Sequence, residues 1–329
     1  MIISLSYMPY RRLSDSRPPP CFELWVRTNL KRLDALRPFN MPPHVMARLR
    51  RYIETMLLAE GLPPTPGNIV MLIDDFSRLL ALSRNGTPIV YRKRNTLSLL
   101  FDMFSVQSEM RLDDPDELVL GYTQSMMAFL MFQPSPREIG MIGLGGGSLA
   151  KFCYRHLPEA AITVAEIDPH VIALRDCFHI PANDARFHVH CMDGAQLVGQ
   201  RPQRFDVLVV DGFDSTGQPA QLCSQQFYDD CFEALAPGGI MAVNLLYDEP
   251  QTAQYLARIE RSFNGAVTVI DSFDSLNKIA FAYKGDLRAI DAHTFVERLA
   301  RLGPHYPAML RMAADMVLRQ GSGKPGKPG

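Results

Sequence analysis

The sequence predicts an α/β fold in which a doubly wound, mainly parallel sheet is preceded by a small β unit and closed by an antiparallel hairpin. From residue 138 onward, apolar strand patterns alternate with helical patterns, which is typical of a parallel sheet covered by helices on both faces. The first of these strands runs directly into a glycine turn, Gly143 to Gly147. The last two strand patterns, 266–270 and 278–283, follow each other without a helix between them. Rossmann-like sheets of the methyltransferase type end in such a hairpin, whereas dinucleotide-binding sheets usually finish parallel.

The first 70 residues differ in composition from the rest of the chain. They carry ten Lys and Arg against five Asp and Glu, net +5, whereas residues 71–329 have a net charge of −6. They also hold ten of the 25 prolines, and only residues 45–59 show helical periodicity. We therefore expect residues 1–70 to be a basic, proline-rich appendage that is poorly ordered and not needed by the core.

A small antiparallel unit is expected next, because residues 88–110 alternate polar and apolar side chains in three short runs. Asp113 to Asp116 supply residues that favour a helix start, and a methionine-rich apolar helix is predicted over 118–132. We expect these methionines to fill the core. Together these elements form a predicted N-terminal β/α unit over residues 71–135.

The main domain is predicted over residues 136–320, followed by a disordered tail at 321–329. Its parallel strands are expected near 139–143, 161–166, 187–191, 206–211 and 239–246. Its helices are expected near 148–157, 169–178, 224–236, 250–262, 293–302 and 306–320.

The glycine turn indicates a ligand site, because Gly143, Gly145 and Gly147 lack Cβ atoms and let a ligand approach the backbone and the helix N-terminus. Glu166 ends the next strand, where an acidic side chain can accept both hydroxyls of a ribose. Ser148 replaces the third glycine of the dinucleotide fingerprint, so the turn better fits enzymes that bind sulfonium nucleosides. The alternative is that the glycines serve packing alone.

Further acidic residues follow the later strands. Asp193-Gly194 follows the third strand and can accept from an adenine amino group, and Asp211 ends the fourth strand, with Asp214 on the loop beyond it. The carboxyl ends of parallel strands share one edge of a sheet, so these carboxylates are expected to converge near the glycine turn. Asp168 has an alternative role, because it can cap a helix that begins at the following proline.

Composition excludes several functional classes. The chain has 329 residues, 47% of them hydrophobic, and a net charge of −1, which favours no nucleic-acid partner. The six cysteines form no Cys-x-x-Cys pair, and His188 and His190 have no further ligand spacing nearby, so no metal is expected. No apolar run approaches the ~18 residues that a membrane span needs, so we expect no membrane contact and a cytoplasmic protein.

The order of these motifs resembles the spermidine synthase (polyamine aminopropyltransferase) family over roughly residues 98–283. The motifs are the glycine turn, Val-Ala-Glu-Ile-Asp-Pro, Met-Asp-Gly, Val-Leu-Val-Val-Asp-Gly-Phe-Asp, Gln-Phe-Tyr and Ala-Pro-Gly-Gly-Ile. The resemblance implies a transferase of polyamine biosynthesis that moves an aminopropyl group from decarboxylated S-adenosylmethionine to a small-molecule amine. It also implies a homodimer.

By motif, the resemblance implies that Glu166 takes the ribose hydroxyls and Asp193 the adenine amino group. It implies that Asp211 is the catalytic carboxylate and that Asp214 holds the attacking amine. Gln107 looks like the glutamine that reaches the nucleoside. Tyr122 looks like the tyrosine of the family's Tyr-His-Glu motif, also on the catalytic side.

The sequence departs from the family pattern in four motifs. Gly146 stands where the glycine turn of the family carries an aspartate, and Thr123-Gln124 replace the histidine and glutamate of Tyr-His-Glu. Ser215 replaces a proline, and the loop at 272–277 has no tyrosine. Loss of the turn aspartate makes room for a ligand that keeps its own carboxylate, as S-adenosylmethionine does. The alternatives to aminopropyl transfer are therefore an S-adenosylmethionine-dependent methyltransferase and a non-catalytic nucleoside-binding protein, and the identity of the acceptor stays open.

Overall fold

The structure, a computed structural model, describes a little more than half of the chain. The described residues are 88–93, 95–101, 106–199, 202–214, 217–246, 251–272, 277–286, 292–301, 306, 311–312 and 315–317. The expected appendage at 1–70, its helix at 45–59 and the tail at 321–329 lie outside them, and the division into domains stays a prediction.

The main sheet has seven strands in the order β6-β5-β4-β7-β8-β10-β9. Its strands are β4 (Glu138–Ile142), β5 (Ala161–Glu166), β6 (Phe187–Cys191), β7 (Phe205–Val210), β8 (Leu235–Leu246), β9 (Val267–Asp271) and β10 (Asn277–Tyr283). β4 to β8 pair in parallel, whereas β10 is antiparallel to both β8 and β9. The predicted Rossmann-like, doubly wound sheet with its closing hairpin is confirmed. Because β4 lies between β5 and β7, the winding direction changes there, and ligands bind at such a switch point.

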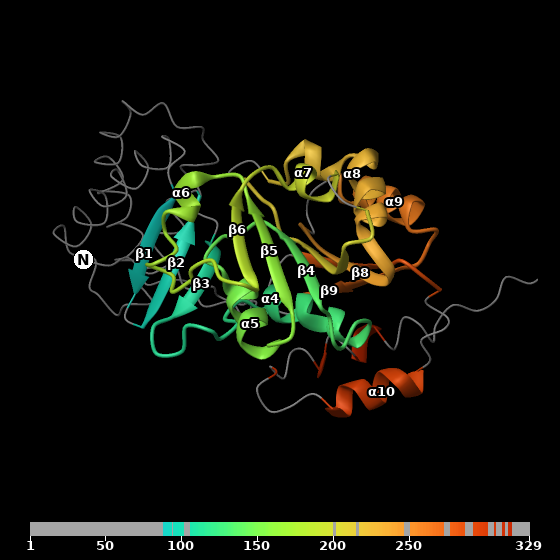
Figure 1. Cartoon of the computed structure of the whole chain (residues 1–329), viewed down its shortest axis with the longest axis horizontal. Coiled ribbons are helices and arrows are strands. Elements are labelled where there is room, and N and C mark those ends of the chain that lie inside the picture. The colour runs from blue at the N-terminus through green and yellow to red at the C-terminus, as the bar shows by residue number, and fades with distance from the viewer. Residues whose placement is uncertain are drawn as a thin grey trace, which may run out of the picture. The chain divides into compact units, whose positions relative to one another are not determined.

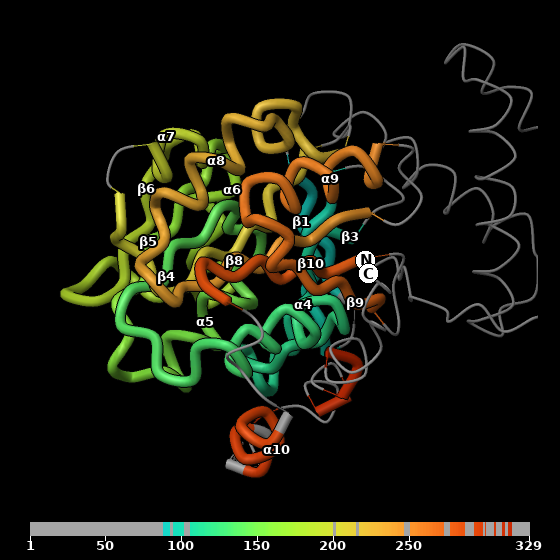
Figure 2. Tube along the Cα trace, turned by 90° about the vertical axis from the view of Figure 1, so that its right-hand side faces the viewer, coloured from blue at the N-terminus to red at the C-terminus, as the bar shows by residue number. Residues whose placement is uncertain are grey.

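Helices cover both faces of this sheet (Figures 1 and 2). On one face lie α4 (Gly121–Met126) and α5 (Ser148–His156), and on the other lie α7 (Gly194–Gly199), α8 (Gln225–Ala234) and α9 (Thr252–Ser262). Alternate strand residues enter the two cores: Met141 and Val209 join the first, and Ile142 and Val210 the second. Burial on both faces explains why these strands are continuously apolar in sequence. The two other α-helices that the structure describes in this part of the chain are α6 (Pro169–Ile172) and α10 (Ala292–Arg301).

The small N-terminal sheet is an antiparallel meander of β1 (Ile89–Lys93), β2 (Thr96–Leu100) and β3 (Val106–Arg111), as the alternating pattern predicts. Its third strand reaches the glycine turn of the main sheet. The hydroxyls of Ser108 in β3 and Ser148 at the start of α5 lie 3.1 Å apart and share a hydrogen bond. The small sheet therefore contacts the glycine turn, at which the nucleoside site is predicted.

Two expected helices are shorter in the structure than predicted. The run 118–132 forms α4 and then a 3₁₀ helix over Met127–Met131. Nearly every side chain of this second part is buried, so its apolar pattern has no polar stripe from which a helical period could be read. The expected helix at 169–178 ends at Ile172, and the chain then turns so that Phe178 and Ile180 pack beside the glycine turn.

Candidate active site

The glycine turn joins β4 to α5 with three residues in the left-handed region. The φ angles of Gly143, Gly145 and Gly147 are 92°, 52° and 70°, a conformation that side chains disfavour. A Cβ at Gly143 would lie 2.3 Å from the Asp211 carbonyl oxygen, and one at Gly147 would lie 2.5 Å from Ile180 Cγ1. Packing thus requires two of these glycines. At Gly145 the nearest atom would be 3.8 Å away, so the turn is open there for a ligand.

Glu166 ends β5 and fastens the glycine turn to the following loop. Its Oε2 accepts a hydrogen bond from the Leu144 backbone N–H at 2.8 Å, and its Oε1 accepts one from the Asp168 N–H at 2.9 Å. The side chain is only 8% exposed. Each carboxylate oxygen can accept a second hydrogen bond, so a fixed Glu166 still has lone pairs for two hydroxyls.

Asp168 and Asp193 both begin helices. Asp168 Oδ1 accepts from the His170 N–H at 2.8 Å at the start of α6, which confirms the capping alternative for this residue. Asp193 Oδ1 accepts from the Ala195 N–H at 2.9 Å at the start of α7, a helix that the sequence did not predict. A Cβ at Gly194 would lie 2.2 Å from the Ile142 side chain, so this glycine permits the close approach of α7 to β4.

Asp211 follows β7 directly, and its backbone N–H donates to the Ile142 carbonyl at 2.9 Å. Its Oδ1 accepts from Asn244 Nδ2 at 2.8 Å, and its Oδ2 accepts from the Tyr122 hydroxyl at 3.3 Å. The same hydroxyl lies 3.1 Å from the Gln107 carbonyl, so its one hydrogen is shared. The structure thus brings Gln107, Tyr122 and Asp211 together from β3, α4 and the end of β7.

Burial raises the pKa of Asp211 to about 6, although the hydrogen bonds from Asn244 and Tyr122 act in the opposite direction. A carboxylate with such a pKa is mostly ionised at neutral pH and is a stronger base than an exposed aspartate. This is the protonation state and the basicity that a general base needs.

Asp214 lies three residues beyond Asp211, on an exposed turn. Its backbone N–H donates to the Gly217 carbonyl at 2.9 Å, and the Gly217 N–H donates back at 3.3 Å. These two hydrogen bonds hold Asp214 against Gly217, between the end of β7 and the segment that leads to α8.

Sequence reasoning missed three polar residues around Asp211, namely Gln218, Asn244 and Asn277. Asn244 donates to Asp211, Asn277 Nδ2 donates to Asn244 Oδ1 at 2.8 Å, and Gln218 Nε2 donates to the Asn244 backbone carbonyl at 2.8 Å. The signal was present, because Asn244 interrupts the otherwise apolar run of β8 at a position that is only 2% exposed.

The glycine-turn departure has a structural reason. A Cβ at Gly146 would lie 2.6 Å from Ser108 Oγ and 2.9 Å from Phe178 Cδ1. An aspartate at this position would therefore need its neighbours to move. Ser108 and Phe178 occupy the space that the Cβ of such a side chain would need.

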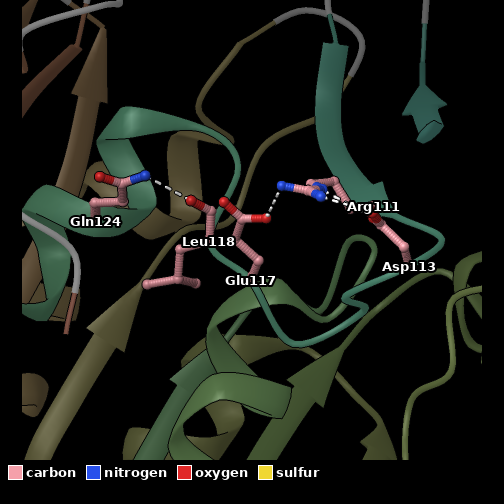
Figure 3. Close-up of polar contacts among 5 residues, drawn as sticks. All are labelled: Arg111, Asp113, Glu117, Leu118 and Gln124. Atoms are coloured by element: carbon pink, nitrogen blue, oxygen red, sulfur yellow. Dashed lines mark hydrogen bonds and ion pairs between the residues drawn. The ribbon is translucent and has the colours of Figure 1, made fainter. Parts of the chain in front are cut away.

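The departures in α4 serve local structure. Gln124 Nε2 donates to the Leu118 carbonyl at 2.6 Å (Figure 3), and Thr123 Oγ1 donates to the Leu120 carbonyl at 2.5 Å. Both side chains fasten the first turn of α4, which carries Tyr122, to the loop before it.

The other end of that loop is held by Arg111 at the end of β3. Its guanidinium lies 2.7 Å from an Asp113 carboxylate oxygen and 2.9 Å from a Glu117 carboxylate oxygen (Figure 3). These pairs are partly exposed to solvent, and they order the connection from β3 to Tyr122.

The described part of the chain has no metal-binding cluster and no membrane-spanning helix. Among the residues that the structure describes, no group of three or more His, Cys, Asp or Glu could hold a metal ion. His188 and His190 stack on each other along β6, with ring centroids 6.1 Å apart. None of the described helices is long and apolar enough to cross a membrane.

Comparison with known proteins places the chain in a family. The spermine/spermidine synthase domain matches residues 120–271. A polyamine aminopropyltransferase of Neisseria meningitidis is 32% identical over 233 residues, which cover 70% of this chain and 89% of that protein. One from Chromobacterium violaceum is 35% identical over 191 residues, 58% of this chain and 73% of that protein.

Solved structures show the same fold. A spermidine synthase in complex with the transition-state analogue AdoDATO has a TM-score of 0.56 at 20% identity and covers 70% of this chain and 80% of its own. Human methyltransferase-like protein 13 in complex with SAH has a TM-score of 0.50 at 23% identity and covers 64% and 95%. The sequence relatives show that the chain belongs to the spermine/spermidine synthase family, whose members named polyamine aminopropyltransferases are transferases.

Proposed function

We propose that this protein transfers an aminopropyl group from decarboxylated S-adenosylmethionine to an amine acceptor, with Asp211 as the general base. The observation that carries this proposal is the environment of Asp211. Its carboxylate lies at the switch point of the sheet, is partly buried, and accepts hydrogen bonds from Asn244 and Tyr122. A carboxylate in such a position is suited to a reacting amine.

The nucleoside side of the site supports a sulfonium-nucleoside donor. The open turn at Gly145 and the fixed carboxylate of Glu166 meet at the carboxyl ends of β4 and β5. We assign Glu166 to the ribose hydroxyls, Asp193 to the adenine amino group and Gln107 to the nucleoside side. The donor supplies the activated carbon beside its sulfonium.

In the proposed reaction the nitrogen of the amine attacks the methylene carbon next to the sulfonium. A nitrogen–carbon bond forms, the carbon–sulfur bond breaks, and its electron pair stays on sulfur, which leaves a neutral thioether nucleoside. The attacking nitrogen gives up one proton, which Asp211 accepts, and its pKa of about 6 keeps it ionised for this step at neutral pH. Asp214 attracts a cationic acceptor. The main contribution of the protein to the rate is the alignment of the amine nitrogen with the methylene carbon.

The altered acceptor side supports an acceptor that need not be putrescine. The Thr123 and Gln124 side chains donate hydrogen bonds to loop carbonyls. The family pattern has a histidine and a glutamate at these two positions, and this chain therefore lacks the acceptor contacts that those residues would make.

An S-adenosylmethionine-dependent methyltransferase is the second candidate, and the observation that favours it is Gly146. No carboxylate stands in the glycine turn to meet an aminopropyl ammonium group, and Ser108 and Phe178 fill the space that one would need.

The test offers the purified protein each donor separately, decarboxylated S-adenosylmethionine and S-adenosylmethionine, with putrescine, spermidine and agmatine as acceptors. Mass spectrometry identifies the product. The proposal expects an amine that is heavier by an aminopropyl group, with the decarboxylated donor only. A product heavier by a methyl group, formed with S-adenosylmethionine, would establish the second candidate instead. Absence of any product with either donor would contradict both.

A further inference from the structure

We propose that Asn244 is a positioning residue for Asp211 and that Asn277 sets the direction of the Asn244 amide. Together they form a relay of hydrogen bonds that runs from the closing hairpin to the carboxylate, fixes its orientation and stabilises its charged form. The inference rests on the proposed role of Asp211 as the base, and it adds two residues that act through Asp211.

The relay has one direction. Asn277 Nδ2 donates to Asn244 Oδ1 at 2.8 Å, and Asn244 Nδ2 donates to Asp211 Oδ1 at 2.8 Å. An ionised carboxylate only accepts hydrogen bonds, so Asn244 must present its NH₂ group to Asp211 and its oxygen to Asn277. If the Asn244 amide turned over, two oxygens would face each other at Asp211. The donor from Asn277 opposes this flip.

The backbone of β8, which lies between β7 and β10, holds Asn244 in place. β8 pairs with β7 up to Val243, and Asn244 pairs with Ile279 of β10 on the other side. Beyond the end of β7, Gln218 Nε2 donates to the Asn244 carbonyl at 2.8 Å and continues the pairing with a side chain. Asn244 is therefore fixed through its side chain and its backbone.

Burial gives a second argument for a functional role. Asn244 is 2% exposed and lies between apolar residues of β8. A buried amide costs free energy unless it is hydrogen-bonded, and an apolar residue would pack in such a strand without this cost. An amide at this position can donate to Asp211 and accept from Asn277 at the same time, which an apolar side chain cannot do.

The groups that face Asp211 are few in the part of the chain that the structure describes. From α4, Tyr122 donates at 3.3 Å and shares its hydrogen with the Gln107 carbonyl of β3; from β8, Asn244 donates at 2.8 Å. Asp214 lies on the turn three residues further along. Among the charged side chains with known positions, none forms an ion pair with Asp211. Burial raises the pKa of Asp211, and two hydrogen bonds oppose this rise. The bond from Asn244 is the shorter of the two.

The test measures the ionisation of Asp211 directly, in the full chain and without substrate, through the ¹³C resonance of its carboxyl carbon during a pH titration. Two variants break the relay at different points. Asn244→Leu removes the donor to Asp211. Asn277→Leu removes the donor to Asn244 without adding a charge near Asp211, so nothing opposes the flip of the Asn244 amide. Lys278→Met is the matched control, since this neighbour of Asn277 in β10 pairs with Asp271 instead.

Both relay variants are expected to raise the titration midpoint of Asp211 by about one pH unit, a tenfold change in its protonation ratio, while Lys278→Met leaves it unchanged. Where turnover is measured, the acid limb of the plot of rate against pH should also move to higher pH, and the affinity for the donor nucleoside should stay unaltered. A wild-type midpoint in both relay variants would overturn the proposal, and a shift in Asn244→Leu alone would remove Asn277 from it. Should Asn244→Leu fail to fold, Asn277→Leu decides the question. Absence of turnover by the wild type would contradict the proposed function, whereas the titration still decides the relay.

Discussion

Replacing Glu166 with glutamine is expected to weaken both the fold and the nucleoside site. The carboxylate accepts two backbone hydrogen bonds, from Leu144 at 2.8 Å and from Asp168 at 2.9 Å. A glutamine can accept only one of them, and its NH₂ group would face the other N–H. Hydrogen bonds to charged groups contribute about 1.5–3 kcal/mol each and neutral ones about 1 kcal/mol, so the free energy of unfolding should fall by about 2–4 kcal/mol.

Urea unfolding of the full chain measures this loss, and calorimetry with both sulfonium nucleosides measures the affinity. Glu159→Gln is the control, because Glu159 is 75% exposed and pairs with an exposed Arg137, so its loss should change stability by less than about 1 kcal/mol. The reasoning is refuted if Glu166→Gln is as stable as the control. Unchanged nucleoside affinity would remove Glu166 from the ribose site.

Three further predictions follow from the site and its surroundings. Asp211→Asn should be more stable than the wild type at pH 7 by up to about 2–3 kcal/mol, because the Asp211 pKa of about 6 in the folded protein, against about 3.9 in the unfolded chain, makes the charged form costly in the folded state. This gain in stability should vanish as the pH falls from 6 to 4, and a pH-independent difference in urea unfolding would contradict the prediction. Gly194→Ala should lower stability by about 1–3 kcal/mol, since its Cβ would lie 2.2 Å from Ile142; Gly199→Ala, with nothing within 4 Å, should not, and equal melting temperatures for the two variants would refute the clash. Burial lowers the pKa of Lys151 to about 8, so wild-type stability should rise relative to Lys151→Met between about pH 8 and pH 10; parallel stability curves for the two proteins would contradict the shift.

The strands and the acidic strand ends could be predicted from the sequence, because strands buried on both faces are continuous apolar runs that stop at a polar residue. The three strands of the small sheet and the closing hairpin were predicted for similar local reasons. The end of α6 could not be predicted, because it depends on contacts of Phe178 and Ile180 with the glycine turn, far away in the sequence. Helix α7 has only six residues, too few to show a helical repeat of apolar residues in the sequence.

The role of Asn244 illustrates what the sequence hides in the site. Its function depends on the register of β8 against β10, which brings Asn277 within 2.8 Å of it, and on the end of β7, which brings Asp211 to its other side. No local pattern encodes that register. Likewise, the sequence indicates that Glu166 lies near the ligand, but the backbone N–H groups that it accepts from become neighbours only in the folded turn.

The most direct test of the central claim compares the rate of aminopropyl transfer in the wild type and Asp211→Asn at saturating decarboxylated S-adenosylmethionine. Glu159→Gln is the control, since Glu159 is 75% exposed and precedes β5, at the opposite edge of the parallel strands from Asp211. Loss of a general base is expected to lower the rate by about 10²–10⁴-fold, with the affinity for the donor unchanged in calorimetry and the control as active as the wild type. An Asp211→Asn variant that transfers the aminopropyl group at the wild-type rate would contradict the account.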